Sequence, residues 1–238
     1  MIDAAKIFRD IQPGFQQPGA AFAEDSEATE LSYQEILHDI VECLVAALEA
    51  KDTYTSGHSL RVADMSLDLA RALDIKGSDY ENVHIAAHLH DIGKMGVSEN
   101  ILNKPGKLSA HELVQIQAHP LIGYNVLSKS RMLDKIAKIV LHHHERWDGK
   151  GYPHGLQRND IPFGSRIIAV ADAIDAMTTD RPYKKPLSWE GCYQELQFNK
   201  EKQFDPMVVE AATQLWRKWA VNRQDKQTQP NGGTKQSY

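Results

Sequence analysis

Histidine and aspartate residues that could bind metal are concentrated in the middle of this chain. His90 and Asp91 are adjacent, and ten of the 11 histidines lie between His58 and His154. An imidazole and a carboxylate on neighbouring residues can both face one metal ion, while Lys94, near the same helix face, can meet an anionic substrate. A His-Asp pair alone is weak evidence, because such pairs occur by chance. The histidines clustered around this pair favour metal chemistry.

Candidate metal ligands occur at five separated places in the sequence. They are His58, His90 with Asp91, His119, His143 with His144, and Asp172. Each place lies on, or at the end of, a segment with helical apolar spacing, and helical bundles build metal sites from such inward-facing side chains. Imidazole and carboxylate ligands without thiolate favour Fe or Mn over a structural zinc. The ligands outnumber those of one tetrahedral site, which favours two metals that activate water and clamp a phosphoryl group.

The remaining histidines have a simpler interpretation. A single core histidine is more often hydrogen-bonded than metal-bound, and we expect this of His38, His84, His88, His111 and His154. The four-residue spacing of His84 and His88 permits chelation, but ordinary packing or surface exposure is the favoured interpretation. The run of three histidines that begins at His142 could be a solvated turn, and Asp172 alone would be an ordinary helix carboxylate. The joint pattern, which chance explains poorly, favours the metal centre.

The spacing of apolar residues predicts an all-α fold. Helices are expected from Ser32, from about Ser56, over residues 78–90, from the capping box Ser109–Glu112, over residues 133–144, over residues 166–177, and from Asp205-Pro206. A segment rich in glycine and proline, residues 148–162, is expected to be an ordered loop. The predicted organisation is an irregular leader over residues 1–32, one helical domain over 33–220 and a disordered tail over 221–238.

Composition excludes several classes of protein. The chain has 238 residues, a net charge of -5, 42% hydrophobic and 25% charged residues, which is ordinary for a soluble globular protein and gives no sign of a DNA-binding surface. Two cysteines without CxxC spacing argue against a disulfide scaffold or zinc ribbon. Neither a signal-peptide core nor an apolar run of membrane-spanning length is present. We therefore expect a cytoplasmic protein that binds neither DNA nor membrane.

The motifs around these residues resemble a known family. The sequence is similar to HD-GYP domains, the cyclic-dinucleotide phosphodiesterase branch of the HD superfamily of metal-dependent phosphohydrolases. The two motifs that give the family its name stand here as His90-Asp91 and Gly151-Tyr152-Pro153. Further matching segments extend the similarity over roughly residues 35 to 215, and they are 54–59, 101–108, 118–120, 143–153, 161–162, 166–167, 171–172, 175–178, 181–184 and 204–206.

The resemblance implies an HD-superfamily helical bundle around a buried dinuclear metal site. Its implied metal ligands are His58, His90, Asp91, His119, His143, His144 and Asp172, with His142 left outside the set. Asp91 would bridge the two metals, and Lys94 would contact the scissile phosphate. Arg181 and Lys184 would hold phosphate or guanine groups, and Tyr152 would line the substrate cleft. A solvated surface pair at Arg181 and Lys184, and a simple rigid turn at residues 149–153, are the plainer alternatives.

One departure from the family pattern bears on the number of metals. Some HD-GYP members bind a third metal through a Glu one helical turn before the histidine that matches His58. Tyr54 occupies that position here. We therefore expect two divalent metal ions, Fe or Mn, rather than three.

The resemblance implies hydrolysis of cyclic di-GMP to linear pGpG, and of pGpG to GMP. The alternatives are a catalytically silent module that binds cyclic di-GMP or a diguanylate cyclase, and a phosphodiesterase that prefers cyclic GMP-AMP or pGpG. The implied partners besides the cyclic dinucleotide are a GGDEF-type diguanylate cyclase, a separate sensory protein, and a second copy of the chain in a homodimer. A leader of about 32 residues is too short for a receiver domain, so we expect a chain that acts alone, is signalled through a partner, or is truncated.

Overall fold

The structure is a computed structural model that describes residues 26–52, 56–180 and 185–228, with side chains described between residues 35 and 221. Tyr54, Arg181 and Lys184 therefore lie outside the described residues. The chain divides into two units, Met1–Leu37 and His38–Tyr238. Described residues of the first unit belong to a helix, and all of the candidate site lies in the second.

The described residues form helices joined by turns and loops, and their only β pairing is one isolated bridge between Lys200 and Phe204. The α-helices are α2 (Ser26–Lys51), α3 (His58–Ala72), α4 (Gly77–Leu89), α5 (Glu99–Leu102), α6 (Ala110–Gln117), α7 (His119–Leu127), α8 (Asp134–Leu141), α9 (Phe163–Thr178), α10 (Trp189–Phe198) and α11 (Pro206–Thr228). Short 3-10 helices are η1 (Ile92–Gly96), η2 (Arg131–Leu133) and η3 (Arg158–Asp160). The predicted all-α class is confirmed.

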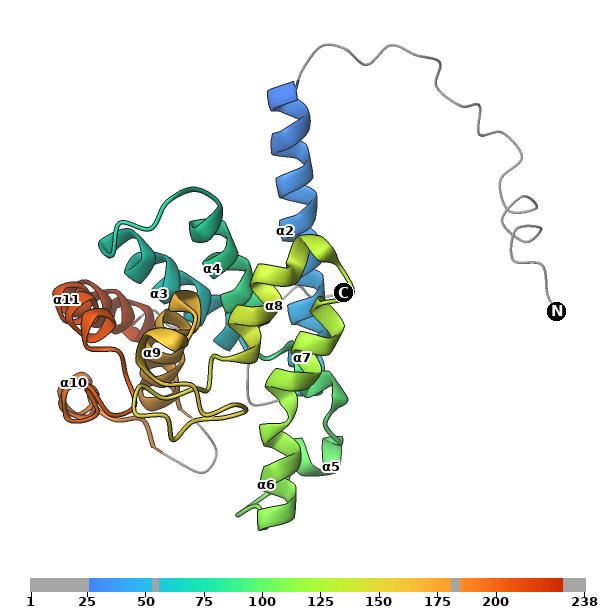
Figure 1. Cartoon of the computed structure of the whole chain (residues 1–238). Helices are drawn as coiled ribbons and strands as arrows, with labels where there is room; N and C mark the ends of the chain where they lie inside the picture. Colours follow the sequence, from blue (N-terminus) through green and yellow to red (C-terminus); the bar gives the residue numbers. More distant parts are fainter. Residues whose placement is uncertain (1–25, 53–55, 181–184, 229–238) are drawn as a thin grey trace, which may run out of the picture. The chain divides into compact units, whose positions relative to one another are not determined.

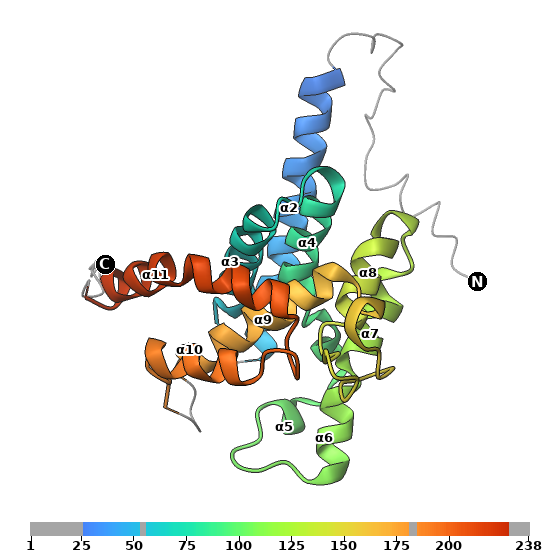
Figure 2. The same ribbon diagram turned by 60° about the vertical axis from the view of Figure 1, so that its left-hand side comes forward.

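Helix α9 is the central helix of the second unit (Figure 1). It contacts α3, α4, α8, α10 and α11, and its residues Ile167, Ile168, Val170, Ala171 and Ile174 have no exposed surface. A helix that is apolar around most of its circumference is stable only when other helices cover it. Figure 2 shows α10 and α11 on one side of α9, with α7 and α8 on the other. Asp172 on α9 is therefore largely shielded by neighbouring helices, with 21% of its side chain exposed.

Two helices extend beyond their predicted boundaries, and one helix was not predicted. Helix α2 begins at Ser26 rather than Ser32, and α11 extends to Thr228, into the segment predicted to be disordered. Alanine, glutamate, glutamine, lysine and arginine in these segments favour helix without producing apolar periodicity, which was the signal used. Helix α10 was missed; its Ser188 cap accepts a hydrogen bond from the Gly191 backbone N–H at 3.0 Å.

Helix α8 ends at Leu141, so the predicted continuation to His144 is wrong. The imidazole of His142 donates to the carbonyl oxygen of Lys138 at 2.8 Å, and that of His143 donates to Val140 at 2.6 Å. These carbonyls are among those that lack a backbone partner at a helix end. The histidine rings thus cap the helix, and the chain turns at the place where two candidate ligands are needed.

Two predicted helix starts are confirmed. Ser109 and Glu112 form a complete capping box at the start of α6. The Asp205 carboxylate accepts a hydrogen bond from the backbone N–H of Met207 at 2.8 Å, with Pro206 at the first position of α11. Both contacts satisfy backbone donors that a helix leaves free at its N-terminus.

The turn that carries Asp91 lies directly against α7. At Gly93, within η1, a Cβ atom would overlap the carbonyl oxygen of His119 and come within 2.5 Å of the Gly123 backbone nitrogen. Only glycine, which has no Cβ, permits this approach between the two backbones. The glycine therefore fixes Asp91 beside His119 at the start of α7.

Replacing Gly93 with alanine should destabilise the protein by about 2 kcal/mol or more, since overpacking against rigid backbone costs on this order. Thermal denaturation should show a melting temperature lower by about 4–8 °C. Gly191→Ala is the matched control, because a Cβ there meets side chains rather than backbone, Ser188 at 3.3 Å and Leu187 at 3.8 Å, and alanine favours helix. A Gly93→Ala protein as stable as the control would contradict the close-approach argument.

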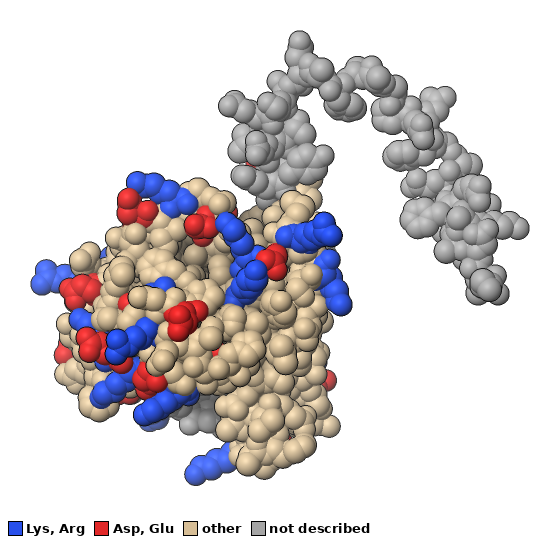
Figure 3. Space-filling model, viewed as in Figure 1, with Lys and Arg blue, Asp and Glu red and all other residues tan. Residues whose placement is uncertain are grey.

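Basic and acidic side chains are interspersed over the visible face of the described unit (Figure 3). This distribution agrees with the small net charge of -5 and differs from the single-sign stripe of a nucleic-acid-binding surface. Among the described helices, none combines the length and apolar character needed to cross a membrane.

Candidate metal centre

The five predicted ligand places converge in the interior of the second unit. His58 starts α3, His90 and Asp91 follow α4, His119 starts α7, His143 and His144 follow α8, and Asp172 lies on α9. Their ligand atoms form two groups, each within 4.8 Å: one of His58, His90 and Asp172, and one of His119, His143 and His144. Six of the seven predicted ligands therefore form two three-residue groups, and the seventh is Asp91.

Asp91 lies between the two groups. Its Oδ2 atom is 3.5 Å from Nε2 of His90 and 3.8 Å from Nε2 of His58. Its Oδ1 atom is 3.3 Å from Nε2 of His119, which belongs to the other group. The two oxygens of this buried carboxylate thus face different groups, which is the geometry of a bridging ligand.

Backbone carbonyls orient three of the histidine rings. Their Nδ1 atoms donate hydrogen bonds to the carbonyl three residues earlier: His90 to Ala87 (2.8 Å), His119 to Ile116 (2.7 Å) and His143 to Val140 (2.6 Å). Because a carbonyl only accepts, the proton must reside on Nδ1 and leave the Nε2 lone pair free. This is the usual support of metal-binding imidazoles.

His58 is oriented by a carboxylate that the sequence analysis did not select. Its Nδ1 atom lies 2.8 Å from Oδ2 of Asp175, and Arg61 binds the same carboxylate through Nε at 2.7 Å. Burial opposes the charge on Asp175, but the hydrogen bonds from His58 and Arg61 outweigh it and hold the pKa of that carboxyl far below its usual range. The available signal was helical spacing: Asp175 is one turn from Asp172, and Arg61 is one turn from His58.

Replacing Asp175 with asparagine should weaken metal binding about tenfold or more, the usual cost of losing the partner that orients a ligand imidazole. Titration of metal-free protein with Mn²⁺ would measure the change. Asp79→Asn is the matched control, because Asp79 lies on α4 with a side chain that is 73% exposed. Equal affinities in the two variants would show that Asp175 has no role in holding His58.

Burial keeps the histidines of the second group neutral. It lowers the pKa of His119 and of His143, and lowers that of His144 to about 4. Neutral imidazole is the form that binds metals. In His58, burial likewise opposes protonation, but the hydrogen bond to Asp175 and the nearby carboxylates raise its pKa. Protons therefore compete with metal more strongly at His58 than in the second group.

Lys94 provides a largely buried positive charge beside this cluster, with 17% of its side chain exposed. Its Nζ atom is 2.7 Å from Oδ2 of Asp91 and 3.4 Å from Oδ2 of Asp52. Burial opposes the charge on Lys94, but the two carboxylates outweigh it and raise its pKa. Burial also opposes the charge on Asp91, and Lys94 with the nearby histidines holds the pKa of Asp91 well below its usual range. Asp52, at the end of α2, was not predicted.

The residues fit divalent metal ions. The Nε2 atom of His90 is buried and forms no hydrogen bond with any described residue. An unpaired polar atom in the interior is costly, and a cation facing its lone pair would satisfy it. Five imidazoles, the Asp172 carboxylate and the bridging Asp91 carboxylate, without thiolate, suit hard or borderline divalent ions.

The Gly151-Tyr152-Pro153 segment lies against the second group. The Tyr152 ring stacks on His144 with centroids 4.9 Å apart, and burial together with Asp91 and Asp172 raises the pKa of its phenol, which therefore stays protonated. A Cβ at Gly151 would come within 2.5 Å of the Glu145 Cα atom, so glycine is required for this approach. The buried Glu145 carboxylate accepts the His154 backbone N–H at 2.7 Å and holds the loop.

A cavity of about 400 Å³ opens beside the cluster. His143, His144 and Asp172 are among the residues that line it, together with Arg146 and Met177. This volume falls within the range of small-molecule sites. The cavity gives a ligand access to the side of the cluster that contains Asp172.

Comparisons with known proteins agree with this architecture. An HD domain family model matches residues 42–208. A cyclic di-GMP phosphodiesterase of Thermotoga maritima is 38% identical over 206 residues, which cover 84% of this chain and 56% of the relative. A 3'3'-cGAMP-specific phosphodiesterase 2 of Vibrio cholerae is 40% identical over 185 residues, which cover 77% and 35% of the two chains.

A solved structure shares the fold. It is an HDG"Y"P protein from Bdellovibrio bacteriovorus, with a TM-score of 0.58 and 21% identity, covering 75% of this chain and 60% of the other. Helical architecture, the clustered His and Asp side chains and the family match together define the class: the chain belongs to the HD domain family, which confirms the resemblance drawn from its motifs. The chain spans about half the length, or less, of the curated relatives described above.

Proposed function

We propose that this chain is a metal-dependent phosphodiesterase that hydrolyses cyclic di-GMP to pGpG and pGpG to GMP. The observation that carries the proposal is the position of Asp91, whose two carboxylate oxygens face two different groups of ligands. The Nζ atom of Lys94 lies 2.7 Å from one of these oxygens, Oδ2. The named activities of the similar proteins from Thermotoga maritima and Vibrio cholerae support a cyclic dinucleotide as substrate.

The proposed cofactors are two divalent metal ions, Fe or Mn. His58, His90 and Asp172 would hold one, His119, His143 and His144 the other, and Asp91 both. When bound, such a pair makes hydroxide available near neutral pH and neutralises charge on a phosphodiester. The Nδ1–H groups of His90, His119 and His143 are bound to carbonyls, so these rings serve as fixed ligands rather than proton donors.

The remaining predicted site residues would bind the substrate. Lys94, kept cationic by Asp91 and Asp52, would donate to a non-bridging oxygen of the scissile phosphate as charge develops there. The phenol of Tyr152, which stacks on His144 and stays protonated, would donate a hydrogen bond to the substrate at the edge of the cleft. Arg181 and Lys184 stay predicted contacts for phosphate or guanine groups.

Cyclic GMP-AMP is the second candidate substrate. The observation in its favour is the 40% identity to a 3'3'-cGAMP-specific phosphodiesterase of Vibrio cholerae, which is comparable to the 38% for the Thermotoga maritima cyclic di-GMP enzyme. Guanine and adenine differ in a few edge groups, so a small number of pocket contacts decides between them.

Product chromatography tests both candidates. Protein loaded anaerobically with Fe²⁺ or Mn²⁺ is incubated with cyclic di-GMP, cyclic GMP-AMP or pGpG, and kcat/KM is measured for each. We expect pGpG and then GMP from cyclic di-GMP. A larger kcat/KM for cyclic GMP-AMP would select the second candidate. Tight binding of cyclic di-GMP with none of these products would instead identify a silent receptor.

Co-purification would test the proposed protein partners. These partners are a GGDEF-type cyclase, a sensory protein or a second copy of the chain.

Metal analysis of anaerobically purified protein should find two iron or manganese ions per chain in this centre. The residue at position 54 is tyrosine, which lacks the carboxylate with which some HD-GYP members bind a third ion. Elemental analysis with parallel protein quantification gives the count. Three ions of these metals per chain would overturn the expected number.

A further inference from the structure

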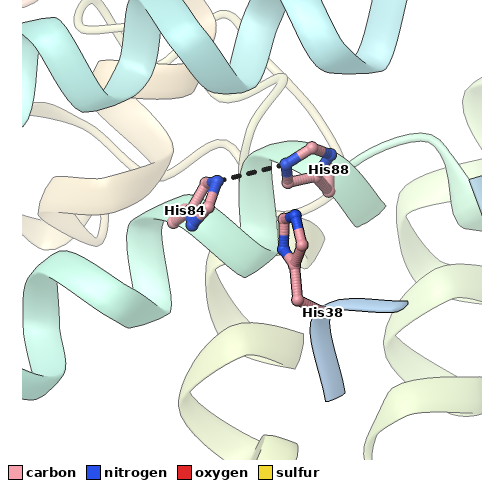
Figure 4. A group of neighbouring side chains, drawn as sticks. All are labelled: His38, His84 and His88. Atoms are coloured by element: carbon pink, nitrogen blue, oxygen red, sulfur yellow. Dashed lines mark hydrogen bonds between the residues drawn. The ribbon is translucent and has the colours of Figure 1, made fainter. Parts of the chain in front are cut away.

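Another three histidines lie together outside the candidate metal centre. We propose that they bind a transition-metal ion of the zinc, nickel or copper(II) class. The group is His38 on α2 with His84 and His88 on α4 (Figure 4). One ring nitrogen from each residue lies within 4.8 Å of the other two. Three imidazoles without carboxylate or thiolate suit these borderline ions better than magnesium, calcium or manganese.

The distances between the rings fit a shared ion. The Nε2 atoms of His84 and His88 are 3.2 Å apart. Two nitrogens bound at about 2.0–2.1 Å in tetrahedral geometry stand roughly 3.3 Å apart, so the two rings are already at chelating separation. The His38 ring centroid lies 5.5 Å from that of His84 and 5.6 Å from that of His88, nearly equidistant from the pair.

The helices place these rings by simple periodicity. His84 and His88 are one turn apart on α4, the spacing by which two histidines on one helix face chelate a metal. His38 precedes the buried residues Val41 and Val45 at three- and four-residue spacing, so it shares the face of α2 that packs into the core. Figure 4 shows His38 pointing from its helix toward the other two rings.

Glu42 places a negative charge beside this group. Its Oε1 atom is 3.2 Å from Nε2 of His38, one helical turn away. That charge would favour a cation bound by the neighbouring rings. The His38 side chain is 43% exposed, so an ion can reach the group from solvent.

Such a site would cross-link two helices. An ion held by all three rings would join α2 to α4, and α4 ends directly before His90 and Asp91. The sequence favoured ordinary packing for these histidines because a single core histidine is more often hydrogen-bonded than metal-bound. Only the fold brings His38 near the other pair. The competing explanation is a hydrogen bond between two neutral imidazoles, which the 3.2 Å separation also allows.

Zinc-binding stoichiometry of the full chain tests the proposal. Iron- or manganese-loaded protein is titrated with Zn²⁺ by calorimetry and equilibrium dialysis, for wild type, His84→Ala and His38→Ala. Each variant should lose one zinc equivalent that the wild type binds, while its iron or manganese content is unchanged. His111→Ala is the matched control, because His111 is exposed on α6, bonded to Gln115, and should not alter the zinc count.

Equal zinc counts in wild type, His84→Ala and His38→Ala would overturn the site and leave the imidazole hydrogen bond as the explanation. If His84→Ala also lost its iron or manganese, a folding defect would be the cause, and His38→Ala, at a half-exposed position, would decide. The readout does not use cyclic dinucleotide hydrolysis, so the result is independent of the proposed function. Zinc should also raise the melting temperature of wild type, and not that of either variant, by the linkage of binding to stability.

Discussion

Replacing Asp91 with asparagine should abolish hydrolysis of cyclic dinucleotides and reduce the bound metal. Asparagine keeps the size of the side chain but has one ligand oxygen and no charge, so it cannot bridge both groups of histidines. The ions contribute several kcal/mol of charge stabilisation in the transition state, and each 1.36 kcal/mol is a tenfold change in rate. We expect kcat to fall at least about 10³-fold. Metal content by elemental analysis and turnover by product chromatography measure the two effects together.

Asp79→Asn provides the control for Asp91→Asn, since it makes the same chemical change at a side chain that is 73% exposed. Circular dichroism and melting temperature establish that the Asp91 variant is folded. Full activity with full metal content in the folded variant would remove Asp91 from the centre. Retained metal with lost activity would show that Asp91 acts on the reaction without bridging the ions.

Much of the candidate site was accessible from the sequence, for a physical reason. Histidines and aspartates in line with the apolar residues of a helix point toward the interior, so His58, His119 and the His90-Asp91 pair were expected to meet. Asp172 is different, because a carboxylate on a helix has no local mark of function. The joint pattern and the family motif selected it, and the structure places it 3.4 Å from Nε2 of His58.

Contacts between distant segments could not be predicted from local spacing. Asp175 holds His58, which is 117 residues away in the chain, and Asp52 meets Lys94 across 42 residues. Periodicity assigns a residue to the face of a helix but does not state which helix that face meets. Gly93 poses the same difficulty, because its contact with the His119 backbone depends on how α7 packs.

Apolar periodicity predicted the ends of some helices inaccurately. Apolar periodicity placed the start of α2 at Ser32, whereas strong helix formers extend it to Ser26. At α8 the predicted helix continued to His144, whereas the imidazole rings cap the last carbonyls and end the helix at Leu141. Polar residues that compete for backbone groups decide such boundaries, and they do so through contacts that a hydrophobic pattern does not contain.

Replacing Lys94 with methionine should leave metal bound and slow the reaction. Methionine retains much of the apolar stem and removes the ammonium that lies 2.7 Å from Asp91. Removing one group that stabilises developing oxyanion charge costs roughly 10²–10³ in kcat. Because the ammonium and a metal ion compete for the same Asp91 carboxylate, metal affinity should be unchanged or higher. Single-turnover kinetics and Mn²⁺ titration separate the two quantities.

Lys135→Met is the control for Lys94→Met, because Lys135 lies on α8 with a side chain that is 67% exposed. A purely structural role for Lys94 predicts reduced stability and metal loss with kcat per bound metal unchanged. The phosphate-binding role predicts the reverse, and Lys94→Arg should then restore part of kcat, since guanidinium keeps the charge but changes its geometry. An unchanged kcat in metal-replete Lys94→Met would exclude this lysine from charge stabilisation and assign it to neutralising Asp91 and Asp52 alone.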